Sequence, residues 1–283
     1  MEYPKDRTPV KLVRIRHKKK SLKLAVYETA NTFDLYIGGP DVYCINAFIN
    51  KPTSIYVQHG TAELSVGSIS NILYNIECSM EHNFQKGLDT TAIVHLLISY
   101  VKNQYPYVST LTFNDMSHKT CDNDQNVELS EMTYIRTGIT WYQKHFRAYL
   151  NEKDQARFLE RDAKFQALKA KFTWAQMKSI MNTLHVAHMD EDYARTLFEG
   201  AATWQEFFRP LSDTMGIAEF CIFVAPWLHS FLLHTLRFNF SGPRYSIPLE
   251  GAEILDYEEV AFARGGKRFT RKQLKQRPLS IME

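Results

Sequence analysis

Residues 78–115 read CSMEHNFQKGLDTTAIVHLLISYVKNQYPYVSTLTFND, and this stretch decides how the fold is interpreted. A turn at 85–89 contains Gly87 and opens a segment whose apolar residues recur at helical spacing as far as Val101. Pro106 ends this helix, and the β-branched, apolar segment 108–113 predicts a strand. We therefore expect a strand, a turn, a helix and a return strand, an order that can hold a phosphorylated ligand.

A second informative stretch, 129–150, reads LSEMTYIRTGITWYQKHFRAYL and follows a polar segment at 118–126 that predicts a loop. Residues 128–136 fit either a short helix or a strand. Gly138 breaks this element, and the segment TWYQKHF from Thr140 predicts a further short helix that carries Tyr142.

The first 80 residues predict mostly strands. Apolar and polar residues alternate over 11–16 and 22–27, which indicates a hairpin with a basic tip. Further strands are expected at 33–37, 42–49 and 55–58, and residues 62–78 fit two strands or one bent strand.

The chain changes character after residue 150 and becomes helical. Residues 152–171 form an amphipathic pattern, Thr173 and Asp190 are placed to start further helices, and 203–206 has the spacing of a capping box. The apolar run 217–236 contains Glu219 and is broken by Pro226, so we expect a buried helix pair and no membrane segment. A short strand is expected at 245–249. The predicted fold class is α+β: a mixed sheet with helices over 1–150, a mainly helical domain over 151–263 and a basic, flexible tail over 264–283.

The composition is that of a globular protein, with 45% hydrophobic residues in a chain of 283. The net charge of +3 is too small to indicate nucleic-acid binding by itself, although both ends of the chain are basic. We expect a solvated hairpin tip and a solvated tail, with nucleic-acid contact through these ends as the lesser alternative. A protein partner could bind the helical domain.

The four cysteines are far apart and form no CxxC pair, which predicts reduced thiols and a cytoplasmic protein. The residues after Met1 lack the basic, apolar and small-residue pattern of a secretory leader, so none is expected.

The turn before the long helix is the candidate binding site. Free N–H groups at a helix start attract phosphate oxygens, and Gly87 would let the backbone approach a ligand closely. Lys86 and Thr90 could add direct contacts. The alternative is an ordinary helix start.

This order of elements resembles the core of the GCN5-related N-acetyltransferase family. The resemblance lies within residues 60–150 and is carried by Cys78, the Lys-Gly-x-x-Thr turn, Tyr105-Pro106, the segment 112–117 and the segment from Gly138 through Tyr142 to Phe146. The combination is similar to acetyltransferase-like proteins of large DNA viruses, which would place the protein in a host cytoplasm or a virion. The resemblance implies a family-like sheet, acetyl-CoA as the cofactor, an N-acyltransferase activity and Tyr142 as the acid that protonates the leaving thiolate. It implies that the coenzyme A diphosphate is held by Gln85, Lys86, Gly87, Leu88, Asp89 and Thr90. It does not indicate the acyl acceptor.

The sequence departs from the family pattern at two positions. Phe84 stands where the family has Gln or Arg, and Asp89 stands where the second glycine is expected. A carboxylate beside a diphosphate would repel it, whereas the same carboxylate could cap the helix start. These departures keep open a second hypothesis, a non-catalytic structural or interaction protein that retains the fold, for example in a virion or an assembly. Tyr142 could likewise be a packed aromatic, and Glu63 and Glu77 are candidate bases to which no role is assigned. No metal site is expected, since His185 and His188 lack a second pair at matching spacing.

Overall fold

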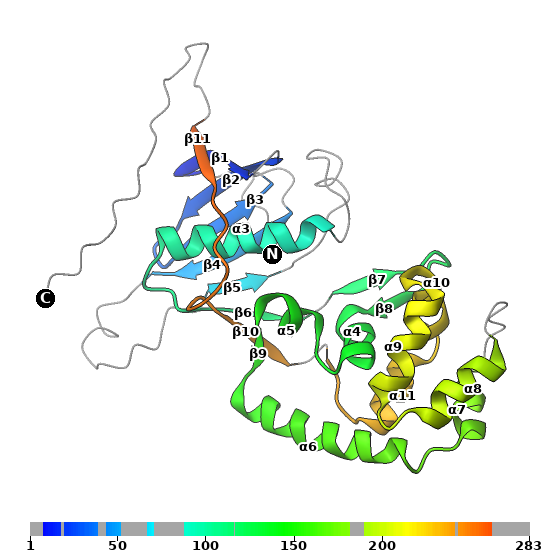
Figure 1. Cartoon of the computed structure of the whole chain (residues 1–283). Helices are drawn as coiled ribbons and strands as arrows, with labels where there is room; N and C mark the ends of the chain where they lie inside the picture. Colours follow the sequence, from blue (N-terminus) through cyan, green and yellow to red (C-terminus); the bar gives the residue numbers. More distant parts are fainter. Residues whose placement is uncertain are drawn as a thin grey trace, which may run out of the picture.

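The computed structural model describes residues 8–17, 20–38, 44–51, 67–70, 88–115, 117–181, 190–240 and 243–261. The sequence predictions at 55–58 and for the tail at 264–283 lie outside these residues. The described chain is an α+β protein with one large sheet and a helical segment beside it (Figure 1).

The large sheet has nine strands in the order β11-β1-β2-β3-β4-β5-β6-β10-β9. The strands are β1 Lys11–His17, β2 Lys20–Glu28, β3 Thr32–Ile37, β4 Ile45–Asn50, β5 Gly67–Ser70, β6 Thr110–Asn114, β9 Tyr149–Leu150, β10 Arg244–Pro248 and β11 Glu258–Ala261. The predicted basic-tipped hairpin is the β1–β2 pair, in which Lys11 faces Val26 and His17 faces Lys20. Alternation of apolar residues correctly located β1 and β2, and the strand predicted at 33–37 corresponds to β3.

One neighbouring pair, β5 and β6, is parallel, whereas the other strand pairs of this sheet are antiparallel. Parallel strands need a crossover connection, and here it contains helix α3, Leu88–Gln104. The helix lies across one face of the sheet (Figure 1) and buries Val94, Leu97 and Val101. The short 105–109 connection joins its C-terminus to the start of β6. The N-terminus of α3 therefore lies toward the C-terminal ends of β5 and β6.

The helical segment is inserted between two strands of the sheet. Leu150 of β9 pairs with Tyr245 of β10, and the chain between them forms α6 Glu152–Lys169, α7 Trp174–Met181, α8 Glu191–Gly200, α9 Trp204–Met215, α10 Ile217–Val224 and α11 Leu228–Thr235. The predicted helical domain of 151–263 thus ends in two strands, β10 and β11, that belong to the sheet of residues 1–150. The capping box at Thr203 and the cap at Asp190 form as predicted.

The two parts share one hydrophobic core, which runs from Val13 in β1 through Tyr134 to Leu249. Aromatic rings fill the helical part of it. Phe165 of α6 stacks on Trp204 of α9 with ring centroids 5.3 Å apart, and the indole N–H of Trp204 donates to the Phe165 carbonyl at 2.8 Å. Helices α10 and α11 form the predicted pair, bent by 63° around Pro226. Within the described residues, no individual helix has the length and apolar character needed to cross a bilayer, although this bent pair together meets those two criteria.

The prediction of a loop at 118–126 is wrong. Strands β7, His118–Thr120, and β8, Asn126–Glu128, form an antiparallel hairpin that leads into α4, Leu129–Thr137. The hairpin is mostly exposed, with Val127 and Cys121 as its buried apolar anchors, so no alternating pattern marks it in the sequence. Gly138 ends α4 at φ 78°, and α5, Trp141–Phe146, follows.

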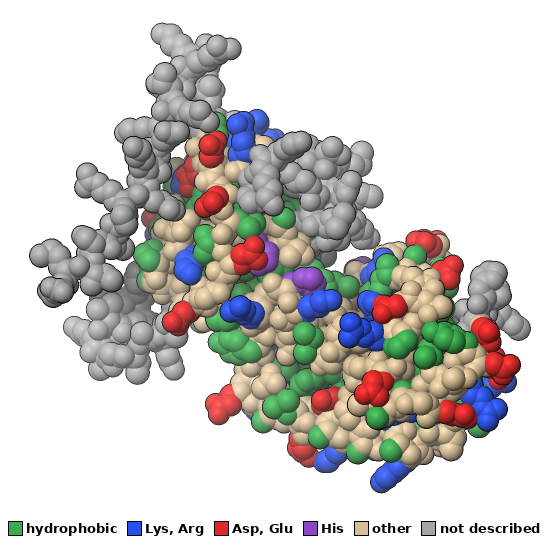
Figure 2. Space-filling model, in the orientation of Figure 1, with side chains coloured by type: hydrophobic (Ala, Val, Ile, Leu, Met, Phe, Trp, Pro, Cys, Tyr) green, Lys and Arg blue, Asp and Glu red, His purple; other side chains and the backbone are tan. Residues whose placement is uncertain are grey.

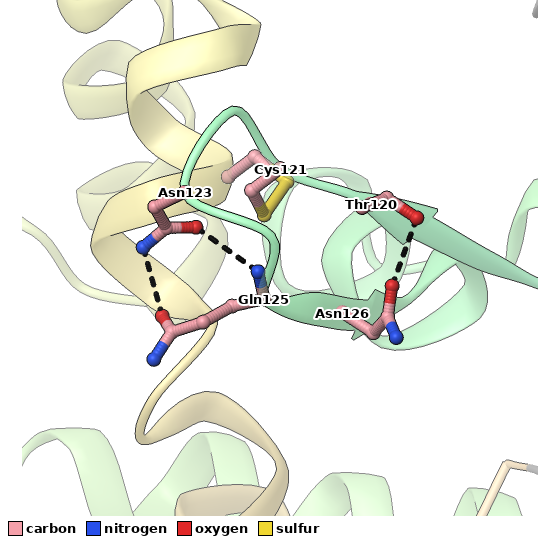
Figure 3. The surroundings of a disulfide bond; sticks show 6 residues. Thr120, Cys121, Asn123, Gln125 and Asn126 are labelled. Carbon is pink, nitrogen blue, oxygen red and sulfur yellow. Dashed lines mark hydrogen bonds between the residues drawn. A yellow bond between two sulfur atoms is a disulfide. The ribbon is translucent and has the colours of Figure 1, made fainter.

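The prediction of reduced thiols is also wrong. Cys121, in the β7–β8 turn, and Cys221, on α10, form a disulfide with Cα atoms 5.5 Å apart (Figure 3). Cys44 is disulfide-bonded as well. The partners Cys121 and Cys221 are 100 residues apart, and only the fold brings them together. Disulfides persist in oxidising environments, so the reason for expecting a cytoplasmic protein is removed, while the location itself stays a prediction.

Candidate functional site

The predicted cofactor turn is described only from its helical side. Leu88, Asp89 and Thr90 form the first turn of α3, as the sequence predicts, whereas Gln85, Lys86 and Gly87 lie outside the described residues. The first N–H groups of a helix have no partner within it, so the start of α3 carries the positive end of the helix dipole. Free N–H groups of this kind attract anions in general.

Tyr142, the predicted acid, lies in the core. A capping box between Thr140 and Gln143 starts α5 and fixes the orientation of this short helix. The Tyr142 ring is 2% exposed, and its centroid lies 4.3 Å from that of Phe113 on β6. Burial, followed by the negative charge of Asp115, raises the pKa of Tyr142 above its ordinary value. This environment favours the alternative role that the sequence left open, a packed aromatic.

Asp115 follows β6 directly and forms a closed polar cluster beside Tyr142. Its Oδ1 accepts hydrogen bonds from the Ser117 hydroxyl at 2.6 Å and the Ser117 N–H at 2.9 Å, and its Oδ2 accepts one from the Ser130 hydroxyl. The residue is 1% exposed. Burial raises the pKa of Asp115, and the serine hydrogen bonds oppose this shift. Both oxygens are used, so the cluster ties the end of β6 to the start of α4.

A second buried carboxylate, Glu131, lies one residue after Ser130 on α4 and has a different environment. Its Oε1 lies 2.7 Å from Nδ1 of His229 on α11, and its Oε2 has no hydrogen-bond partner among the described residues. The Glu131 side chain is 1% exposed and that of His229 is 49% exposed. The pair therefore links a buried carboxyl group to the surface.

The Glu131–His229 pair lines a pocket of about 360 Å³ between the β7–β8 hairpin and helices α4 and α11. Its other polar side chains are His118, Asn126 and Glu128. Figure 1 shows the hairpin next to α4 and α10, where the Cys121–Cys221 disulfide fastens it. Hydrogen bonds also hold the turn in shape, with the Asn123 side chain donating to Gln125 at 3.0 Å (Figure 3).

Burial raises the pKa of Glu131 to about 7, against the opposing effects of the hydrogen bond and charge of His229. The negative charges of Glu128 and Asp115 add to the upward shift. A carboxyl group that titrates near neutrality beside an imidazole can both bind a cation and exchange a proton.

The sequence interpretation missed Asp115, Glu131 and His229 as site residues. The available signal was a charged residue inside an otherwise buried helix, since Met132, Tyr134 and Ile135 flank Glu131 in the core. His229 was visible only as a polar residue within an apolar run. Nothing in the sequence showed that these two residues, on α4 and α11, would meet.

The remaining candidates receive little support or lie outside the described residues. Arg14 and Arg16 of the first basic cluster are exposed on β1, and the basic tail, Glu63, Glu77, His185 and His188 are not among the described residues. Figure 2 shows acidic and basic side chains mixed over one face, without a large surface of one sign. Within the described ranges, no three His, Cys, Asp or Glu side chains are placed to hold a metal ion.

Comparisons with known proteins leave the chain without an assigned family. No protein-family model matches it, and no significant match is found among curated proteins or solved structures.

Proposed function

We propose that this chain is an acetyl-CoA-dependent N-acyltransferase-like protein whose cofactor site has weakened. One observation carries the proposal: β5 and β6 are a parallel pair within a sheet whose other strand pairs are antiparallel, and the crossover between them contains α3. The order of these elements is the one that the resemblance implies. The crossover brings the start of α3 to the C-terminal ends of the two strands, and free N–H groups at a helix start suit a diphosphate.

In this proposal the turn Gln85, Lys86, Gly87, Leu88, Asp89 and Thr90 holds the diphosphate of coenzyme A. The cofactor, when bound, supplies an activated acyl thioester. Backbone N–H groups of the first α3 turn would donate to phosphate oxygens, and Lys86 would add a positive charge. The Asp89 carboxylate opposes binding, so we expect weak affinity. The role of Tyr142 as acid stays a prediction, and its burial supports a packing role.

Calorimetry with acetyl-CoA tests the proposal. We expect the wild-type chain to bind at micromolar to millimolar ligand. Gly87→Glu should abolish binding, because it adds bulk and negative charge beside the phosphates. Asp89→Asn should raise the affinity several-fold, since it removes one like charge at nearly constant volume. An unchanged unfolding midpoint for each variant without ligand serves as the control. No heat at millimolar acetyl-CoA would refute the proposal.

The second candidate is a non-catalytic interaction protein, favoured by the burial of Tyr142 and by the core that the sheet shares with the inserted helices. A protein partner would then bind the helical segment. This alternative predicts that Asp89→Gly leaves partner binding unchanged and that acetyl-CoA does not bind. A crystal soak that places coenzyme A in the turn would argue against it.

A further inference from the structure

The pocket beside Glu131 contains a buried acceptor without a donor. Within the described residues, Oε2 of Glu131 has no hydrogen-bond partner, although the side chain is 1% exposed and lines the pocket. Buried polar groups in native proteins are almost always paired, so the unpaired oxygen of a residue that lines a pocket retains the capacity to accept a hydrogen bond from a ligand. The neighbouring Asp115 uses both of its oxygens and shows that this region can satisfy a carboxylate internally.

The charges around the pocket select a cation as the donor. Its ionisable lining residues are Glu128, Glu131, His118 and His229, with no lysine or arginine among the lining residues. Asp115 adds a third nearby carboxyl group, whose charge acts on Glu131. The carboxylates of Glu128 and Glu131 make the lining negative at pH 8, which opposes a phosphate or a carboxylate ligand.

The geometry of the Glu131 carboxyl group favours one kind of cation over another. A guanidinium group is held best by both oxygens of a carboxylate, but Oε1 is already 2.7 Å from His229 Nδ1. A single free oxygen suits a compact ammonium group, which needs one acceptor from this side chain. The rest of the wall is apolar, formed by Val127, Ala225 and Leu228, and can pack against an aliphatic stem.

We propose that the pocket between the β7–β8 hairpin and helices α4 and α11 binds a primary alkylammonium group, which donates to Oε2 of Glu131 while its alkyl chain packs on Ala225 and Leu228. The volume of about 360 Å³ is at the lower end of the range for small-molecule sites, which fits a short alkyl chain. Glu131 is the group that binds the ammonium, His229 occupies its other oxygen, and the site does not depend on the proposed acetyl-CoA function.

The test is an NMR titration of the full-length protein at pH 8 with n-butylammonium, n-butanol and butyrate as matched probes. We expect n-butylammonium to shift the amide signals of α4, α11 and the β7–β8 hairpin saturably, with n-butanol at least about tenfold weaker and butyrate without effect. Glu131→Gln keeps the shape of the side chain and should weaken n-butylammonium binding at least about tenfold. Glu199→Gln, which removes an exposed charge on α8, is the control and should leave binding unchanged.

A second variant keeps the result interpretable if Glu131→Gln alters the fold. Ala225→Leu fills the pocket from the apolar wall without changing any charge and should also abolish n-butylammonium binding. The proposal is overturned if the wild type binds n-butanol with the same affinity as n-butylammonium or binds neither probe. It is also overturned if both variants bind n-butylammonium with the affinity of the wild type. Acetyl-CoA binding measured on the same variants should not change, which separates this site from the proposed cofactor turn.

Discussion

Asp115 and Glu131 are two buried carboxyl groups whose surroundings differ. They are neighbours, because Asp115 accepts a hydrogen bond from Ser130, the residue before Glu131 on α4. Asp115 accepts hydrogen bonds at both oxygens, from Ser117 and Ser130, and its charge acts on the buried Tyr142. Glu131 has one oxygen paired with His229 and the other without a partner, beside a pocket. A closed network of this kind fixes structure, whereas an open one retains capacity for a ligand or a proton. The difference separates a structural carboxylate from a candidate functional one.

The largest expected effect concerns the Cys121–Cys221 disulfide, which fastens the β7–β8 hairpin to α10 beside the pocket that Glu131 lines. Cys121→Ala with Cys221→Ala opens a link that spans 100 residues, and the chain-entropy argument predicts a loss of about 4 to 5 kcal/mol in the free energy of unfolding. Hydrogen exchange should accelerate most in the β7–β8 hairpin and α10, and least in β6 and β10 near Asp115. Equal acceleration in both regions would show that the two carboxyl groups belong to one cooperative unit.

Asp115→Ala should lower the free energy of unfolding by about 4 kcal/mol, because two hydroxyl groups and one N–H lose their buried acceptor. Urea denaturation measures the loss. Asp115→Asn retains one acceptor oxygen and should cost less. A change below about 0.5 kcal/mol for the alanine variant, as is usual for a surface substitution, would remove Asp115 from its structural role.

Glu131→Gln should change stability in a pH-dependent manner. Folding raises the pKa of Glu131 from 4.5 to about 7, so the folded protein binds this proton more tightly than the unfolded chain does. The resulting stabilisation is complete below pH 4.5 and is lost as the pH rises to 7. The stability of Glu131→Gln relative to wild type should therefore increase by about 3 kcal/mol between pH 4.5 and pH 8.

Urea denaturation at several pH values checks this expectation, with Glu199→Gln as the exposed control. A difference between Glu131→Gln and wild type that stays constant with pH would show that Glu131 is not perturbed. The comparison with Asp115 would then lose its basis.

The smallest effect is expected for Glu128→Gln. The charge of Glu128 raises the pKa of both Asp115 and Glu131, so its removal should lower both pKa values. NMR titration of the carboxyl carbons measures the two shifts. The free energy of unfolding should change by less than about 0.5 kcal/mol, because Glu128 is only partly buried. A shift of only one carboxyl group would mean that the two do not share this neighbour.

The sequence predicted most helices and strands because their patterns are local. Helix α3, the caps at Asp190 and Thr203 and the β1–β2 hairpin follow from spacing and residue type within a few positions. Three features do not: the return of β10 and β11 to the sheet, the Cys121–Cys221 disulfide and the Glu131–His229 pair. Each joins residues far apart in the chain, and their meeting depends on how the helices pack.

The candidate site likewise combines a local feature that the sequence predicts with a long-range contact that it does not. The helix start at Leu88 was predictable from a glycine-containing turn and apolar periodicity. The burial of Tyr142 was not, because Phe113 and Tyr245, which enclose it, come from β6 and β10. A tyrosine on a short helix looks the same in sequence whether it faces a ligand or the core.

The pairing of Leu150 with Tyr245 also constrains the order in which the chain can fold. Strands β9 and β10 behave as a hairpin whose turn is the whole of residues 151–243, so the edge of the sheet closes only after both ends of that segment meet. Closing so long a loop is slow while the loop is disordered, whereas helices with local contacts form early. We therefore expect the inserted helices to form first. Their packing then brings β10 between β6 and β9, so completion of the sheet is a late step in folding.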